Sequence, residues 1–596
     1  VVVRHILSNL NFIFMAKTSV LARPLPDSSL PRNTFERSYF TRLNWSAGQL
    51  IPVFCKVVPE GSSGEINRSV FMRTNAVNTA AFPKMDTHID FYKVPLKFLM
   101  TRYEEWKTNI DDVNSTSLYD GIGGASVYAP PTTRVPLSLP YTDVGEMALA
   151  LANTSWTDDL GFSWSSGCKK LMDLLDYNDQ YAGIASTDPR AALQLNTLRI
   201  QAYQKVYYDH YRNSAYESNQ PFAYNADVLY TNSDAGKWKY GIANFRELWK
   251  IRYVNYRKDF FMNIYPALNY TVSTPQGQDW LLPSSVVGAQ NGSSNVTFGV
   301  NPADSTHSSA YLYTTGGSAT NSKVLSAQTI RAVFALDKLQ RMSAYAPKHV
   351  KDQIEARFGV KKPNSSTYES TYLGSFKNDI VIGEVTSTAD TQNSGNGLAL
   401  GAIGGRGVGA EGSGKSIHYE ITGQDGDCII IGMMYTIARS AYDSWRLDAF
   451  NFKFLREDIF QPEFMDLGLR PIMLKEVFWP TTPGGPSLAQ LNTILGYVPR
   501  DQEYKLEVDE NHGEFRYGQS LSAFVNHTNV NTVQRGHVLG TAGVNLTFFK
   551  VSPSDLDSIF VQSFVSTAPS TDQFFGEFNF KFVSRQNMSV HGQPRL

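Results

Sequence analysis

The sequence predicts a mainly β fold, in which a scaffold of strands carries large insertions. Segments that alternate with a period of two residues lie near both ends of the chain, and helical periodicity is confined to the middle. Aromatic residues make up 13% and charged residues only 18%, against about 25% charged in an average soluble protein. Aromatic residues with few charges are typical of strands, and equally of surfaces that are buried against partners.

The strand signals are sets of apolar residues that share one face of an extended chain. One continuous apolar run, from Cys428 to Tyr435, predicts a strand that is covered on both sides. The alternating sets are Ile51, Val53, Cys55 and Val57; Thr87, Ile89 and Phe91; and Phe578, Phe580 and Phe582.

Three helices are predicted between these strands from apolar residues three or four positions apart. The first carries Leu195, Leu198, Ala202, Val206 and His210; the second follows Ser326 and carries Ile330, Val333, Phe334 and Leu339; the third follows Pro347 and carries Val350, Ile354 and Phe358. Gly359 is the expected stop of the third helix.

The length of 596 residues predicts either several domains or one heavily elaborated domain. Residues 267–325 are rich in Asn, Ser, Thr and Gly, residues 386–416 are rich in Gly, and both are expected to be long loops. No repeat period is visible. Because Met15 resembles a natural start, residues 1–14 are interpreted as an upstream or non-native extension.

The formal net charge of −1 argues against a polybasic nucleic-acid binder. The three cysteines, Cys55, Cys168 and Cys428, are too few and too scattered for a disulfide framework or a zinc site, and are expected to be buried thiols. The longest apolar run is far shorter than the ~20 residues of a membrane helix, so no membrane insertion is expected.

Residues 409–416, GAEGSGKS, satisfy the phosphate-binding pattern GxxxxGK[ST] in full. A true phosphate-binding loop is entered by a buried strand and left by a helix. Here a glycine-rich segment precedes the motif, and an alternating, strand-like segment follows it. We therefore interpret the motif as a chance match, and no catalytic residue, metal site or cofactor is predicted.

Several strings, in a shared order over most of the chain, resemble the major capsid protein of the microviruses, small tailless single-stranded DNA bacteriophages, and especially its gokushovirus-like branch. They include LNWSAGQLIPV (43–53), IQAYQKVYYDHYR (200–212), RKDFFMNIYP (257–266), TIRAVFALDKLQ (329–340), QPEFMDLG (461–468), GYVPRDQEY (496–504) and MSVHGQPRL (588–596). The first fourteen residues and the Gly-rich segment 393–416 depart from the pattern.

The resemblance implies an eight-stranded antiparallel jelly-roll β-sandwich with long, partly helical insertions, so residues 15–596 are expected to be one domain. It also implies self-assembly into a small icosahedral T=1 shell around circular single-stranded DNA, in a virion assembled in the bacterial cytoplasm. One large insertion, assigned by position and composition to 267–325, would form a surface protrusion that contributes to host attachment.

The partners that the resemblance implies are further copies of the chain, genomic DNA, a small basic DNA-binding protein, an internal scaffolding protein, a DNA pilot protein and a host-cell receptor. Contacts to DNA combine cations with aromatic faces. The candidates for the inner surface lie in the basic termini: Lys17, Arg23, Arg32, Arg37, Arg42, Lys581, Arg585 and Arg595. The candidate aromatics for subunit contacts are Tyr103, Trp106, Phe478, Trp479, Phe574 and Phe575.

Two alternatives stay open at this point. A P-loop NTPase would rest on residues 409–416 alone and predicts nucleotide binding. A cellular jelly-roll protein that binds carbohydrate would be a monomer or a small oligomer instead of a shell.

Overall fold

The computed structural model describes residues 31–77, 82, 84–100, 103–108, 139–185, 187–229, 239–266, 295–299, 311–315, 331, 335, 338–339, 342, 349–364, 367–386, 403–411, 415–477, 479, 491–528, 546–561 and 572–590. The expected extension 1–14 and most of the helix expected after Ser326 lie outside these residues.

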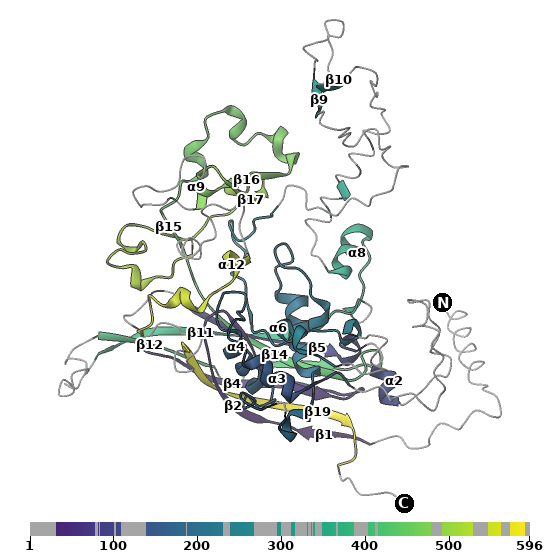
Figure 1. Ribbon diagram of the computed structural model, residues 1–596. Helices are drawn as coiled ribbons and strands as arrows, with labels where there is room; N and C mark the ends of the chain where they lie inside the picture. The colour runs from purple at the N-terminus through teal and green to yellow at the C-terminus, as the bar shows by residue number, and fades with distance from the viewer. Residues whose placement is uncertain are drawn as a thin grey trace, which may run out of the picture.

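An eleven-stranded antiparallel sheet forms the centre of the fold (Figure 1). The strand order is β1-β19-β4-β12-β11-β5-β14-β3-β8, with β2 also paired to β19 and β13 to β4. The strands are β1 (Arg32–Glu36), β2 (Tyr39–Trp45), β3 (Gln49–Val58), β4 (Ser63–Thr74), β5 (Met85–Pro95), β8 (Arg252–Tyr253), β11 (Thr371–Thr386), β12 (Ile403–Glu411), β13 (Ser416–Glu420), β14 (Cys428–Ala438) and β19 (Phe574–Asn587).

This sheet curls into two facing layers. Strands β1 and β2 pair with successive parts of β19, and β12 and β13 pair with successive parts of β4. The first layer therefore consists of β1, β2, β19, β4, β12 and β13, and the second layer of β11, β5, β14 and β3. The layers meet where the ring of Phe54 on β3 lies 5.4 Å from that of Phe580 and 5.3 Å from that of Phe582 on β19. The mainly β jelly-roll prediction is confirmed, and the first and last strands are neighbours.

Alternation along β19 explains how the core is built. Phe574, Phe578, Phe580 and Phe582 are fully buried between the layers, whereas the residues between them face outward. Aromatic rings of this kind pack edge to face, as Phe54 does against Phe91 at 5.5 Å. The period-two pattern therefore marks which side of the last strand faces the core.

Helices from the connection 96–370 cover the outer face of β3, β5 and β14 in the second layer. Helix α5 (Leu198–Val206) lies against β5 and β14, and α4 (Trp164–Leu174) lies against β3. Strand β14 is therefore buried on both faces, as its apolar run predicts. Further helices and strands of this connection include α2 (Tyr103–Thr108), β6 (Tyr141–Asp143), α3 (Val144–Leu151), β7 (Gln194–Asn196), a π-helical turn (Tyr207–Tyr211), α6 (Ile242–Leu248) and α8 (Val350–Phe358).

Helix α8 is the third helix that the sequence predicts. It ends where the backbone of Gly359 adopts a left-handed conformation with a φ of +67°. The N–H of Gly359 donates to the carbonyl of Glu355 at 2.8 Å, which completes the cap. None of its residues is buried, although Val350 and Phe358 are apolar.

A separate lobe is built from the connection 439–573, between β14 and β19. It holds β15 (Tyr442–Asp443), β16 (Leu469–Met473), α9 (Leu474–Val477), β17 (Ile494–Pro499), β18 (Glu510–Asn511) and α12 (Leu546–Phe549). A second hydrophobic core, which includes Phe261, Ile472 and Val498, holds it together. Figure 1 shows this lobe on the opposite side of the molecule from β1 and β19.

Only a hairpin is described within the expected protrusion at 267–325. Strands β9 (Asn295–Gly299) and β10 (Tyr311–Thr315) pair in antiparallel fashion, and the rest of the segment lies outside the described residues. Figure 1 places the hairpin apart from the main sheet, on the same side as the lobe.

The loop expected at 386–416 is in part a strand, and this prediction needs correction. Strand β12 pairs with β11 on one side and with β4 on the other. Because glycine is rare in strands, the sequence of β12 does not predict a strand. The packing of neighbouring side chains nevertheless requires glycine there. A Cβ at Gly407 would lie 2.5 Å from Cγ2 of Thr74 and 2.9 Å from Cγ2 of Ile380. A glycine-rich segment can therefore be a strand wherever side chains from neighbouring strands fill the space.

Candidate nucleic-acid interface

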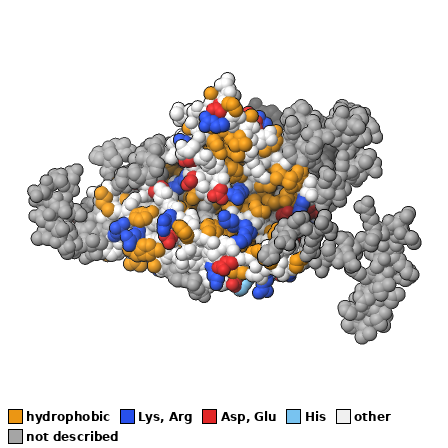
Figure 2. Space-filling view, turned by 90° about the horizontal axis from the view of Figure 1, so that it is seen from below, with side chains coloured by type: hydrophobic (Ala, Val, Ile, Leu, Met, Phe, Trp, Pro, Cys, Tyr) orange, Lys and Arg blue, Asp and Glu red, His pale blue; other side chains and the backbone are white. Residues whose placement is uncertain are grey.

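Over the residues that the structure describes, the outward face of the first layer is open and carries cations from both ends of the chain. Along β1, β2, β4, β12 and β19, alternate residues point away from the core. Figure 2 views the molecule from the side on which β1 and β19 lie, and shows lysine and arginine side chains interspersed with hydrophobic ones. The exposed cations on this face are Arg32, Arg42, Arg73, Arg406, Lys581 and Arg585.

Three of these arginines lie over phenylalanine rings. The guanidinium carbon is 5.1 Å from the ring centroid of Phe40 for Arg42, 4.8 Å from that of Phe71 for Arg73, and 5.8 Å from that of Phe575 for Arg406. The rings stay accessible, since the side chains of Phe40 and Phe71 are 61% and 43% exposed. The face thus presents flat aromatic and guanidinium surfaces beside each other.

Most of the positive charge on this face is not neutralised locally. Arg42 pairs with Glu577 at 2.7 Å. Among the described residues, Arg73, Arg406, Lys581 and Arg585 have no carboxylate within ion-pair distance. These four cations are therefore available to an anionic partner.

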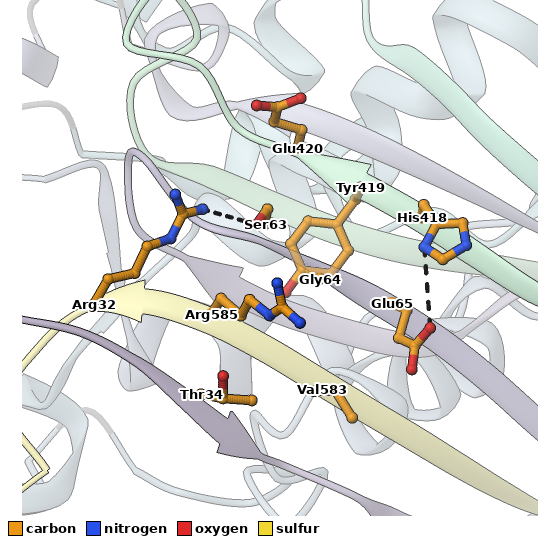
Figure 3. A pocket seen from close by; sticks show the side chains of 10 residues that line it. All are labelled: Arg32, Thr34, Ser63, Gly64, Glu65, His418, Tyr419, Glu420, Val583 and Arg585. Atoms are coloured by element: carbon orange, nitrogen blue, oxygen red, sulfur yellow. Dashed lines mark hydrogen bonds and ion pairs between the residues drawn. The ribbon is translucent and has the colours of Figure 1, made fainter.

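A hollow of about 940 Å³ opens at one end of the face, where β1, β4, β13 and β19 meet (Figure 3). Arg32 donates to Oγ of Ser63 at 2.8 Å, and Arg585 comes from the neighbouring strand. Glu65 and Glu420 also line the hollow, and Glu65 lies 4.0 Å from His418. The hollow thus holds two carboxylates and two arginines without an ion pair between them among the described residues, and most of the exposed cations lie on the open sheet beside it.

The structure brings together four of the predicted basic residues and separates one. Arg32, Arg42, Lys581 and Arg585 share the open face, because β1 and β2 both pair with β19. Arg37 instead lies in the turn between β1 and β2, packs 5.1 Å over the ring of Phe582 and donates to the carbonyl of Val57. Lys17, Arg23 and Arg595 lie outside the described residues.

Sequence reasoning missed the arginines that come from the middle of the chain. Arg73 follows the outward positions of β4, so its alternation with buried Met72 and Thr74 is a signal that could have found it. Arg406 lies on the glycine-rich β12, where the sequence offered no strand pattern. Arg73 reaches this face because β4 pairs with the last strand, β19, and Arg406 reaches it because β12 pairs with β4.

Two of the predicted subunit-contact aromatics belong to the core of the chain, which is a correction. Phe574 is fully buried, with its ring 5.8 Å from those of Trp45 and Phe560. Tyr103 is buried as well and donates its hydroxyl to Asp427 at 2.8 Å; burial raises its pKa. Phe574 has no surface left for a neighbour and Tyr103 keeps only 7%, because each faces the interior of its own chain.

The other predicted aromatics keep some exposed surface or cannot be placed. Trp106 is half-buried against Tyr103, and Phe575 is half-buried beneath Arg406. Trp479 is 42% exposed, and Phe478 lies outside the described residues. The three cysteines are buried free thiols, as expected.

The described residues at the two ends of the segment 409–416 lie on strands, and no described helix directly follows the motif. Strand β12 ends within it, and β13 begins at Ser416, where a phosphate-binding loop continues into a helix. The Nζ of Lys415 donates to the carbonyl of Ser375 at 2.9 Å. The pattern is thus a chance match between two strands.

Comparison with known families places most of the chain in a described family. A family model described as Phage_F, capsid protein (F protein), matches residues 171–596, which is more than half of the chain. No curated protein matches. Within the described ranges, no helix is long and apolar enough to cross a bilayer.

Proposed function

The chain belongs to the phage capsid F-protein family and is a microvirus major capsid protein, and we propose that its copies close into a small T=1 icosahedral shell around a circular single-stranded DNA genome. The family is structural and its members self-assemble into the virion shell. The gokushovirus-like branch and assembly in the cytoplasm of a bacterial host belong to the same proposal, which rests on the sequence strings given above.

In the proposed shell, the open face of β1, β2, β4, β12 and β19 lies toward the genome. The observation that supports this most is the row of arginine–phenylalanine pairs beside unneutralised cations. Single-stranded DNA binds to cations through its phosphates and to aromatic or guanidinium planes through its bases, at about 1–3 kcal/mol per stacked base. On the other layer, helices cover the outer face of β3, β5 and β14.

With a formal net charge of −1, the chain cannot neutralise the phosphate charge of a genome alone. Among the described residues, six exposed cations on the open face stand beside four carboxylates, Glu36, Glu65, Glu420 and Glu577. Such a surface positions DNA but neutralises little of it. A small basic DNA-binding protein and counter-ions supply the remaining charge, and an internal scaffolding protein and a DNA pilot protein complete the set of proposed viral partners.

The polar segment 267–325 is proposed to form the outer protrusion and to contribute to binding of a host-cell receptor. Its hairpin of β9 and β10 lies on the side of the molecule away from β1 and β19 in Figure 1, which suits an outward position. Insertions of this composition tolerate variation, as receptor-binding surfaces require.

The experiment that tests the proposed function is a cryo-electron microscopy reconstruction of particles formed by the full chain with its co-expressed viral proteins. We expect closed shells with density for DNA against the face that holds Lys581 and Arg585. A chain that stays monomeric under all assembly conditions would contradict the shell, and a shell with this face outermost would contradict the DNA contact.

A further inference from the structure

The segment that leads into β11 is attached to the rest of the fold mainly through polar groups. We call residues 349–364 and 367–370 the strap; in the chain they follow the insertion 267–325. The strap carries helix α8, none of whose side chains is buried. Figure 1 shows α8 between the main sheet and the hairpin of β9 and β10. Because burial of apolar side chains does not hold this helix, its position depends on the polar contacts of the strap.

The last residue of the strap is fastened to the helical layer by a buried carboxylate. Ser370 is fully buried, and Asp209 accepts its backbone N–H at 2.8 Å and its hydroxyl at 2.7 Å. Asp209 belongs to the π-helical turn that follows α5, and it also pairs with Lys205 at 2.7 Å. The position of Ser370 is therefore fixed by a charged group from another element.

The neighbouring residue of the same turn, His210, makes a further contact to Ser370. Its Nε2 lies 3.1 Å from the carbonyl oxygen and 3.0 Å from the Oγ of Ser370. Because the hydroxyl donates to Asp209 and a carbonyl only accepts, Nε2 must carry a proton and donate. The ring is stacked on Tyr92 of β5, with the centroids 4.6 Å apart. A second proton on the His210 ring would therefore place a charge in an enclosed site.

A second histidine, His349, holds the residue before Ser370. Its Nδ1 lies 2.9 Å from Oε1 of Glu369, and Oε2 of the same carboxylate lies 3.4 Å from Nζ of Lys351. Since His349 directly precedes α8, this contact joins the start of the helix to the end of the strap. The rings of His349 and His210 lie 6.4 Å apart. Both ends of the strap thus meet at two adjacent imidazoles.

The backbone just before these contacts is strained. Tyr368 adopts a left-handed conformation with a φ of +54°, which is unfavourable for a bulky side chain. Its side chain is 58% exposed and contributes little to holding that conformation. The contacts of the next two residues, Glu369 and Ser370, enforce it, as strained backbone requires. Weakening those contacts therefore lets the strap relax.

We propose that the strap is a pH-sensitive switch, held most tightly at about pH 6.5 and released more often on either side of it. The titratable and charged groups that face the two rings from the elements around them are Tyr92, Lys205, Asp209, Lys351, Asp352 and Glu369. The two histidines are the members of this cluster whose ordinary titration falls near neutral pH.

The two histidines respond to pH in opposite directions. Burial lowers the pKa of His210, although Asp209 and Glu369 oppose this effect. The hydrogen bond to Glu369 raises the pKa of His349. In a released strap both rings titrate at about 6.5. The attachment through His210 is therefore lost as the pH falls below about 6.5 through its lowered pKa, and that through His349 is lost as the pH rises through its raised pKa.

The test measures hydrogen–deuterium exchange of the full-length, unassembled chain from about pH 5 to about pH 8. After correction for the intrinsic pH dependence of exchange, protection of the strap should be highest near pH 6.5. It should fall on both sides by about tenfold for each pKa unit that separates the held from the released state of a histidine. Strand β14, buried on both faces, should keep its protection throughout. Constant protection of the strap, or protection that changes in one direction only, would overturn the proposal.

Variants assign each side of this profile to one histidine. His210→Gln keeps an N–H donor for Ser370 and should abolish the loss of protection in acid alone. His349→Gln should abolish the loss in alkali alone. His418→Gln is the control, because His418 is exposed on β13, and its profile should match that of the parent chain. If either strap variant retains both losses, the proposal fails; if a variant does not fold, the profile of the parent chain still decides. The measurement needs no assembled shell, so its outcome is independent of the proposed function.

Discussion

At the residue scale, a buried ionic cluster joins the helical layer to the connection that leads into β19. Arg252 is 1% exposed and lies 3.1 Å from Glu247, 3.6 Å from Asp159 and 3.8 Å from Glu217. Lys550, fully buried, lies 3.6 Å from the same Glu217. Burial alone would raise the pKa of Asp159, but the charges of Arg252 and Lys250 outweigh it and hold the pKa below its usual value. The cluster is stable only while its opposite charges are all present.

Replacing Arg252 by Met should therefore be strongly destabilising. The variant removes one of the two cationic partners of Glu247 and Asp159 and leaves them Lys250 alone, which should cost about 3–5 kcal/mol of unfolding free energy. Urea denaturation of the unassembled protein measures this. Arg190→Met is the control, because Arg190 pairs with Asp188 at the surface, and we expect no measurable change there. Equal urea midpoints for the two variants would show that the cluster contributes nothing.

A neighbouring carboxyl, Asp158, predicts a pH dependence of stability. Burial raises its pKa to about 6, although the Tyr253 hydroxyl and the N–H groups of Leu160 and Phe162 donate to it. The unfolded carboxyl titrates near pH 4. Because the folded pKa is the higher one, this contribution to stability is full below about pH 4 and is lost as the pH rises through about 6.

Asp158→Asn should remove that dependence. Relative to the parent chain, the variant should gain roughly 3 kcal/mol of unfolding free energy between pH 4 and pH 7, because two pKa units correspond to about that amount. Chemical denaturation at several pH values gives the difference directly. A difference that does not change with pH would mean that Asp158 titrates alike in the folded and unfolded chain.

At the element scale, β12 depends on glycine at chosen positions. The N–H of Gly407 donates to Oγ1 of Thr74 at 2.7 Å, and its missing side chain leaves room for Thr74 and Ile380. Gly383, across the same ladder on β11, has nothing within 4 Å of the place a Cβ would take.

Gly407→Ala should lower the unfolding free energy by about 1–3 kcal/mol, because the added methyl group overpacks the space beside Thr74. Gly383→Ala, on the neighbouring strand, should change it by no more than about 0.5 kcal/mol. Thermal unfolding of the two variants compares them under identical conditions. If both variants melt alike, close packing at Gly407 is not what keeps glycine there.

Elements whose apolar residues form a continuous run or a regular period can be predicted from the sequence, and elements without either cannot. Strand β14 and helix α8 with its glycine stop follow from burial and capping, which act on neighbouring residues. Strand β12 was missed because its packing depends on side chains of β4 and β11, which are distant in sequence. The phenylalanine run near the C-terminus predicted the strand, but which of its residues stay in the core depends on how the two layers meet.

At the scale of the whole molecule, the chain consists of one β-sandwich and two long connections between its strands, residues 96–370 and 439–573. The sequence predicted the basic termini as one site, and the jelly-roll order explains why they meet: β1 and β2 both pair with β19. Arg73 and Arg406 join the same face from the middle of the chain. No local pattern carries that information, since it depends on which strands become neighbours.

The open face also makes a prediction about how the unassembled protein binds single-stranded DNA. Each phosphate contact releases condensed counter-ions, so log K falls with log salt with a slope of about −0.7 per contact for a single strand. Lys581 and Arg585 have no carboxylate partner among the described residues. The double variant Lys581→Ala/Arg585→Ala should therefore weaken binding and flatten the slope by about 1.4. Fluorescence anisotropy of a labelled oligothymidylate over a salt series measures both quantities. Lys361→Ala/Arg190→Ala removes the same charge from exposed positions elsewhere and should leave the slope unchanged. An equal loss in both double variants would mean that net charge, and not this face, governs the contact with DNA.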